Sequence, residues 1–192
     1  MTALTRRLAA ATLVLGLVSA AGLAGAQDSP RVKLATTAGD IVVELYPDKA
    51  PKTVENFLRY VKDKQYDGTI FHRVIGSFMI QGGGFTAEFN EKPTRPPIPL
   101  ETRPDLKNDR GMMAMARTSD PNSASAQFFI NVVDNPNLNA PKPDGHGYAV
   151  FGKVVSGLDV VDKIKVVATG NRGPYQNVPV TPVVIKSATL LK

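Results

Sequence analysis

Short apolar segments, interrupted at close intervals by glycine and proline, run through most of this 192-residue chain. Gly and Pro together supply 31 of its residues. Both residue types end regular structure, Gly through its backbone freedom and Pro because it lacks an N–H group. Only two stretches have helical spacing, and no strand–helix–strand rhythm repeats. The pattern therefore predicts a mainly β protein with a closed antiparallel sheet rather than a doubly wound α/β fold.

The strands are predicted from alternating apolar residues and from the turns between them. Residues 31–36 and 41–46 alternate around a turn at 37–40, which predicts a hairpin. The further strands are expected over residues 69–75, 78–81, 111–116, 127–133, 148–155 and 183–191. The three glycines at 82–84 are expected to break the pattern, as a bulge or turn where two backbone segments approach closely. The Pro-rich stretches 91–104 and 134–147 are expected to be loops.

Two stripes of apolar residues at helical spacing predict the two helices. Pro51 can open the first helix, because its missing N–H is harmless in the first turn. The stripe of that helix consists of Val54, Phe57, Leu58 and Val61. A second, shorter helix is expected after Gly157, with the stripe Leu158, Val161 and Ile164.

The N-terminus has the layout of a secretory signal peptide. Arg6 and Arg7 precede an apolar run over 8–23, and the triplet 24–26 is a small-x-small cleavage site. The alternative is a membrane-anchoring helix, but the run is shorter than the roughly 20 residues that a span needs. The sequence therefore predicts a cleaved signal peptide at 1–26 and one domain at 27–192, without a membrane anchor. A periplasmic location follows, with secretion as the alternative.

Composition excludes several classes of chemistry. With no Cys, the chain cannot form disulfides, cysteine zinc sites or iron–sulfur clusters, and its two His are too few for a histidine-rich metal site. Removing residues 1–26 lowers the formal charge from +6 to +4, and the remaining basic residues are interspersed with acids. This favours a mixed solvated surface over a nucleic-acid interface. Motifs for serine hydrolases, zinc proteases and phosphate-binding loops are absent.

One segment, 71–84, combines a cation and an amide with an apolar pair. Arg73 and Gln81 flank the Phe-Met pair at 78–79. Strict alternation along a strand places Arg73 and His72 on opposite faces. An arginine beside an aromatic patch can bind a neutral carbonyl while an apolar ring fills the pocket. The alternative is an arginine paired with a surface carboxylate above an ordinary Phe-Met core.

This segment resembles the signature of the cyclophilins, a family of peptidyl-prolyl cis–trans isomerases. Two further blocks agree in family order, one at 111–118 with 125–132 and one at 147–154 with 157–161. Features similar to the bacterial exported branch are Arg117, Tyr148 and the stretch 173–179. The resemblance covers nearly all of 31–192. It implies a closed eight-stranded antiparallel β-barrel capped by two α-helices. It also implies a monomer that uses no cofactor or metal and acts on proline-containing unfolded or folding polypeptides.

The resemblance also implies roles for individual residues. It implies a catalytic pair, Arg73 and Gln81. It implies substrate contacts from His72, Phe78, Met79, Ala116, Arg117, Gln127, Phe129, Leu138 and Tyr148. The family usually has an aromatic residue just before the leucine that Leu138 matches, whereas this chain has Asn137. That departure bears on cyclosporin binding more than on catalysis.

Two other functions use the same residues. A proline-peptide binder or chaperone would need the pocket but not an arginine placed as Arg73 is. A β-barrel carrier of small ligands would turn the pocket residues into the barrel, whereas the family resemblance places them in an outer groove. The location of Arg73 therefore distinguishes the carrier from the isomerase.

Overall fold

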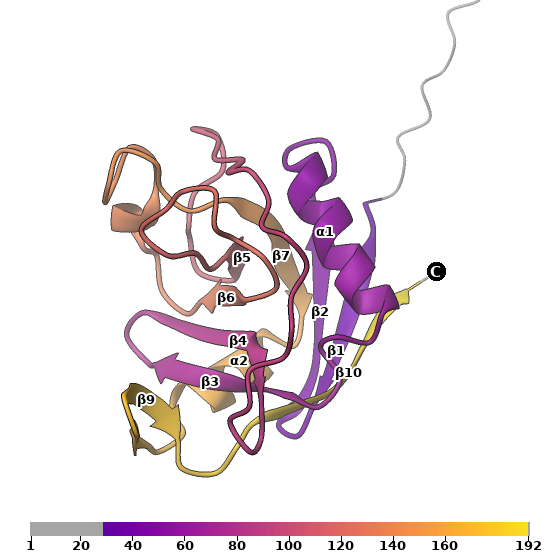
Figure 1. The fold of residues 1–192 in the computed structure, drawn as a ribbon, viewed down its shortest axis with the longest axis vertical. Helices are drawn as coiled ribbons and strands as arrows, with labels where there is room; N and C mark the ends of the chain where they lie inside the picture. The colour runs from indigo at the N-terminus through magenta and orange to yellow at the C-terminus, as the bar shows by residue number, and fades with distance from the viewer. Residues whose placement is uncertain (1–28, 192) are drawn as a thin grey trace, which may run out of the picture.

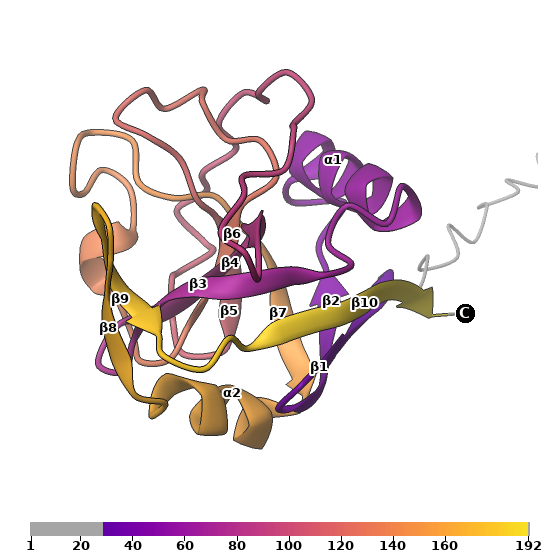
Figure 2. The same cartoon turned by 60° about the horizontal axis from the view of Figure 1, so that its bottom comes forward.

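The barrel closes as the sequence predicts. A computed structural model describes residues 29–191, so the signal peptide expected at 1–26 lies outside the described residues. Eight antiparallel strands form a closed barrel in the order β1-β10-β3-β4-β6-β5-β7-β2 (Figure 1). Two helices accompany it, α1 at one end of the barrel and α2 at the other (Figure 2). The predicted fold class is confirmed.

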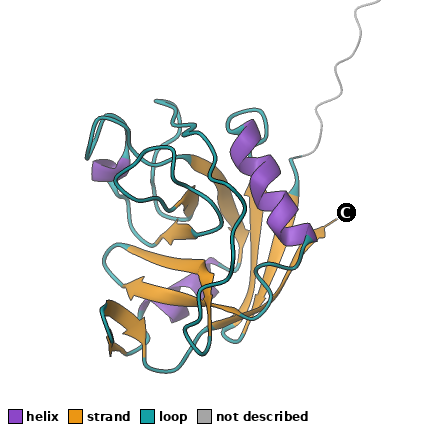
Figure 3. Cartoon of the chain, in the orientation of Figure 1, coloured by secondary structure: helices purple, strands orange, loops and turns teal. Residues whose placement is uncertain are grey.

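Apart from β4 and the hairpin β8–β9, the bounds of the strands and of α1 and α2 follow the predicted segments to within about two residues. The barrel strands are β1 (Arg31–Thr36), β2 (Gly39–Leu45), β3 (Thr69–Ile75), β4 (Met79–Thr86), β5 (Met112–Met115), β6 (Phe128–Asn131), β7 (Val150–Ser156) and β10 (Val184–Leu191). The helices are α1 (Pro51–Lys62), α2 (Leu158–Lys165) and the short 3-10 helix η1 (Pro136–Leu138). Long loops, teal in Figure 3, gather beside β5 and β6. No helix within residues 29–191 is long and apolar enough to cross a membrane.

The barrel interior is filled by aromatic and aliphatic side chains. Phe57 of α1 is fully buried and packs against Phe128 and Phe151 at centroid distances of 5.8 and 5.3 Å. Tyr66 joins the same cluster and donates its hydroxyl to the Ala126 carbonyl at 3.0 Å. Burial of such large rings supplies much of the apolar stabilisation of a small domain. A filled interior leaves no room for the internal ligand of a carrier.

The glycines at 82–84 do not end the strand, which corrects the expected end at residue 81. Strand β4 runs through them to Thr86, with irregular pairing to β3 along this stretch. A Cβ on Gly83 would lie 2.9 Å from the Tyr66 ring, and one on Gly84 would lie 2.7 Å from the Gln127 side chain. These contacts are with side chains, whereas a Cβ on Gly82 would lie 3.0 Å from the backbone carbonyl oxygen of Ile70. The close backbone approach expected from the glycines is therefore present at Gly82, within a continuous strand.

A small hairpin outside the barrel was not predicted. Strands β8 (Thr169–Arg172) and β9 (Tyr175–Pro179) pair with each other and lie beside β3 (Figure 2). All four β8 residues are exposed. A strand without a buried face has no alternating apolar pattern, so periodicity could not reveal it.

Candidate active site

A bulge in β3 sets the direction of the central arginine. Phe71 pairs with Gly82 and Arg73 pairs with Gln81, which leaves His72 as the extra residue. Phe71 packs into the barrel core, whereas His72 and Arg73 both line an outer hollow. The expectation that His72 and Arg73 lie on opposite faces is therefore wrong, because a bulge interrupts strand alternation.

Three side chains, from β3, from β4 and from the residue just before β6, form a polar row. Arg73 Nη1 donates to Gln81 Oε1 at 3.5 Å, and Gln81 Nε2 donates to Gln127 Oε1 at 2.9 Å. Among residues 29–191, no carboxylate lies within ion-pair distance of Arg73. The alternative of an arginine paired with a surface carboxylate therefore has no support in the described chain. The guanidinium keeps most of its donors for a ligand.

A small cavity of about 90 Å³ lies beside this row, on the outside of the barrel. Its lining residues are Arg73, Phe78, Met79, Gln81, Ala116, Arg117, Phe129, Leu138 and Tyr148. The apolar part belongs to a second hydrophobic cluster, separate from the barrel core, in which Met79, Phe129 and Leu138 are buried. Alternation along β6 explains the separation, since Phe128 packs into the barrel core and Phe129 into the outer cluster.

A wider hollow of about 510 Å³ adjoins the small cavity and shares Arg73, Gln81 and Arg117 with it. His72 and Gln127 line this second hollow rather than the small cavity. All eleven residues implied by the resemblance thus line one hollow or the other. Sequence reasoning did not assign the remaining lining residues, which are Phe85, Pro174, Tyr175, Gln176 and Asn177. Four of these belong to the β8–β9 hairpin, and the stretch 173–179 was noted only as a branch feature.

Comparison with known proteins identifies the family. A family model described as cyclophilin type peptidyl-prolyl cis-trans isomerase matches residues 31–190. The chain belongs to the cyclophilin family. The prediction of a cyclophilin-type isomerase is thereby confirmed, and so is the enzyme class.

Bacterial cyclophilins are similar over most of their length. Peptidyl-prolyl cis-trans isomerase cyp18 of Streptomyces antibioticus is 60% identical over 162 residues, which cover 83% of this chain and 98% of the relative. Peptidyl-prolyl cis-trans isomerase A of Dickeya dadantii is 51% identical over 187 residues, which cover 97% of this chain and 98% of the relative. The similarity therefore spans the barrel and both hollows.

Solved cyclophilin structures share the fold. A cyclophilin type peptidyl-prolyl cis-trans isomerase of Cryptosporidium parvum aligns with a TM-score of 0.71 at 28% identity, covering 85% of this chain and 98% of that one. A second structure of that protein, determined in the presence of the dipeptide Ala-Pro, aligns with a TM-score of 0.70 over 84% of this chain and 99% of that one.

His72 of this cyclophilin is buried and neutral at ordinary pH. Its side chain packs edge-on against Phe85, with ring centroids 4.8 Å apart, and the residue is only 5% exposed. Burial, and secondarily the charge of Arg73, lowers the pKa of His72 to about 4. Its Nδ1 has no hydrogen-bond partner among the described residues. An imidazole with so low a pKa is poorly suited to act as a general acid.

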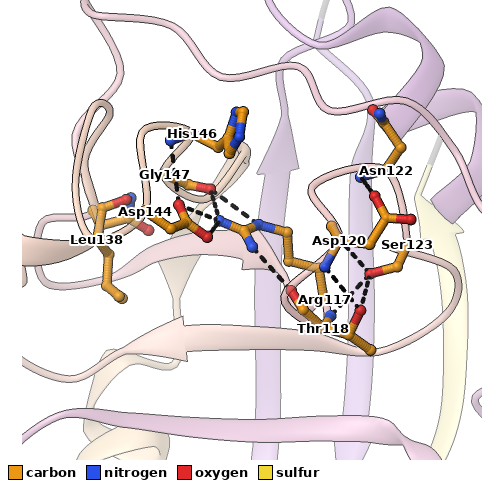
Figure 4. A network of polar contacts seen from close by, with 10 residues as sticks. Arg117, Thr118, Asp120, Asn122, Ser123, Leu138, Asp144, His146 and Gly147 are labelled. Atoms are coloured by element: carbon orange, nitrogen blue, oxygen red, sulfur yellow. Dashed lines mark hydrogen bonds and ion pairs between the residues drawn. The ribbon is translucent and has the colours of Figure 1, made fainter.

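The Arg117 side chain is buried in a polar network that joins two loops (Figure 4). Its Nη2 lies 2.7 Å from an Asp144 carboxylate oxygen, and its guanidinium also donates to the carbonyls of Thr118 and Gly147. The hydrogen bond from Arg117 lowers the pKa of Asp144 below its usual range. Unlike Arg73, Arg117 is already engaged with the protein.

The position before Leu138 lies at the surface. Asn137 is exposed in the middle of η1, while Leu138 is buried in the cavity wall. The cavity thus keeps its leucine wall although the usual aromatic neighbour is missing.

Proposed function

We propose that this cyclophilin isomerises X-Pro bonds in exported polypeptides and thereby assists their folding, with Arg73 as its central catalytic residue. The observation that carries this assignment is the location of Arg73. Its guanidinium has no acidic partner among residues 29–191 and borders a small cavity with apolar side chains in its wall. The relative determined with the dipeptide Ala-Pro supports a proline-containing ligand for a site of this kind.

The reaction demands stabilisation of a twisted amide. Rotation about an X-Pro bond breaks the partial double bond, and the barrier is about 18–20 kcal/mol. No bond is made or cleaved, so the enzyme needs only to bind the twisted form better than both planar forms. A rate gain of about 10⁵ would require roughly 7 kcal/mol of such differential binding.

Arg73 can supply that preference through its N–H groups. Twisting localises the lone pair on the prolyl nitrogen, and a guanidinium donor beside that nitrogen would stabilise it. The partly buried setting strengthens this interaction relative to water. The contact with Gln81 holds the planar fork on one side and leaves the other donors for the substrate.

The small cavity would hold the proline ring against its apolar wall while the preceding acyl group rotates. Phe78, Met79, Phe129 and Leu138 supply its apolar lining. Residues flanking the proline would extend across the shared row into the wider hollow, past Gln127 and His72. An extended polypeptide substrate would thus place its proline ring in the small cavity and its backbone along the polar row.

Export rests on the N-terminal sequence. We infer that residues 1–26 are a signal peptide, that cleavage follows Ala26, and that the monomeric domain 27–192 works in the periplasm, or outside the cell, without a membrane anchor. Mass spectrometry of the protein from a periplasmic fraction tests this. A mature chain beginning at Gln27 supports it, and an uncleaved chain in the cytoplasmic fraction would refute it.

The folding role needs a substrate that is a whole protein. An unfolded protein with a slow, proline-limited refolding phase provides it, because that phase takes tens of seconds or more without a catalyst. Catalytic amounts of residues 27–192 should shorten the phase. Suppression of aggregation without acceleration would instead favour the binder or chaperone.

A further inference from the structure

The segment between Leu138 and Tyr148 forms an exposed loop whose two ends both line the small cavity. Residues 140–146 are exposed throughout. The ends of the loop are joined at its base, where the Tyr148 amide donates to the Leu138 carbonyl at 2.9 Å. The fully buried Asn108 side chain also donates to that carbonyl, at 3.2 Å. These two hydrogen bonds fix the base of the loop at the second hydrophobic cluster, which includes Leu138 and is contacted by Tyr148.

Arg117 holds the C-terminal half of the same loop, at Asp144 and Gly147. Its Nε and Nη2 donate to the Gly147 carbonyl at 3.2 and 2.8 Å, and Nη2 also donates to Asp144 Oδ1 at 2.9 Å. The Arg117 side chain is 1% exposed, whereas that of Asp144 is 35% exposed. A planar fork that reaches a carboxylate and a carbonyl together is a geometry that arginine provides and lysine does not.

The same guanidinium lies against the aromatic wall of the cavity. Arg117 Cζ is 4.4 Å from the centroid of the Tyr148 ring, a cation–π distance. Tyr148 in turn meets Phe129 nearly perpendicularly, with centroids 5.7 Å apart. Tyr148 and Phe129 both line the cavity, so a change at Arg117 is transmitted to its wall.

We propose that Arg117 is a positioning residue, which fixes the loop 139–147 and the Tyr148 ring and so sets how tightly the cavity binds proline. Four hydrogen bonds to Thr118, Asp144 and Gly147 occupy its donors, which leaves little for a substrate. The inference rests on the proposed proline site and differs from a direct substrate contact by Arg117, which the family resemblance implies.

A substitution at Asp144 distinguishes a positioning role of Arg117 from a direct contact between Arg117 and the substrate. Asp144→Ala removes the anchor on the loop but leaves the Arg117 cation in place. A positioning role predicts that Asp144→Ala and Arg117→Met change the protein in the same direction, and that the double variant is no worse than Arg117→Met alone. A direct contact predicts that Asp144→Ala, which frees the guanidinium, leaves substrate binding unchanged or tightens it.

Two measurements are made on residues 27–192 of the wild type and each variant. Hydrogen–deuterium exchange follows the amides of 139–147, and kinetics with an X-Pro tetrapeptide separate KM from kcat. For Arg117→Met we expect faster exchange in this loop and a KM raised about tenfold with kcat changed much less, because ground-state and transition-state binding both weaken. Asp144→Ala should show a smaller change of the same sign, and Arg117→Lys an intermediate one.

The matched control is Arg110→Met. It breaks another Arg–Asp pair, with Asp162 at 2.6 Å, and neither Arg110 nor Asp162 lines either hollow. Exchange in 139–147 and KM should match the wild type. Unchanged KM in Arg117→Met and Asp144→Ala, with or without faster loop exchange, would overturn the positioning role.

Two further outcomes remain decisive. If Arg117→Met does not fold, Asp144→Ala carries the test, because it alters only a partly exposed side chain. If the wild type shows no isomerase activity, the proposed function fails. Exchange together with calorimetric binding of the tetrapeptide then decides the positioning role by itself.

Discussion

Gln81 lies opposite Arg73 in the pairing of β3 with β4, and its side-chain oxygen is 3.5 Å from the guanidinium. Gln81 is itself held by Gln127 on the other side, at 2.9 Å. Within residues 29–191 no other hydrogen bond reaches the Arg73 side chain. The row therefore couples the orientation of the arginine to two neutral amides rather than to a charge.

Replacing the Gln81 amide by a carboxylate should lower kcat/KM more than removing the amide does. Gln81→Glu would pair Arg73 with a charge and withdraw its donors from the prolyl nitrogen. We expect kcat/KM to fall at least about tenfold, and further than in Gln81→Ala. Gln65→Glu is the control, since Gln65 binds the Pro93 carbonyl elsewhere on the surface. An active Gln81→Glu enzyme would contradict this role of the row.

The absence of a side chain at Gly84 leaves the space that the Gln127 side chain occupies. A Cβ at Gly84 would lie 2.7 Å from the Gln127 side chain, so Gly84→Ala must displace it. We expect a loss of about 1–3 kcal/mol in the free energy of unfolding and a lower kcat/KM. Gly170→Ala is the control, because a Cβ added at Gly170 would have nothing within 4 Å. Denaturant unfolding and tetrapeptide kinetics measure both effects. Equal behaviour of the two variants would rule out a packing role for Gly84.

His72 should make folding sensitive to acid. Its pKa of about 4 lies below the unfolded value of 6.5, so the unfolded chain takes up the proton first. Stability present above about pH 6.5 is lost as the pH falls toward 4, by about 3 kcal/mol from this group. The free energy of unfolding of His72→Gln should fall less over this range. Parallel pH profiles of the two proteins would disprove the assignment.

Phe129 should affect both binding and folding, and Phe128 folding alone. Phe129→Ala removes a cavity wall and a buried ring, so KM should rise and stability fall by about 3–5 kcal/mol. Phe129→Leu keeps more of the packing and should separate the two effects. Phe128→Leu is its matched control, because Phe128 packs inside the barrel. If Phe129→Leu kept the wild-type KM, the cavity would not be the proline site.

The family resemblance pointed to eleven residues that line the two hollows but missed Phe85 of β4. Among the elements of the fold, the sequence was sufficient to predict the barrel strands and both helices. Periodicity works there because each strand has one face in a core. It fails at His72, because a single extra residue in β3 reverses the alternation that follows it. Only the paired strand reveals that bulge.

Periodicity did not predict the hairpin β8–β9 for a different reason. Its residues contribute Tyr175 and its neighbours to the wider hollow, yet most of them are exposed. The burial of the Arg117 side chain was equally hidden. Its partners Asp144 and Gly147 lie about 30 residues away in a Pro-rich loop, and no local pattern links them.

Stabilisation of the twisted X-Pro amide by Arg73 predicts a loss of isomerase activity when the guanidinium is removed. The rate of cis–trans isomerisation of an X-Pro tetrapeptide is measured with residues 27–192 of the wild type, Arg73→Ala and Arg73→Lys. Circular dichroism checks that each variant is folded. Folded variants whose kcat/KM is about 10²–10³-fold below the wild type would agree with the loss of a preorganised donor. Near-normal turnover in a folded Arg73→Ala variant would show that Arg73 does not stabilise the twisted amide.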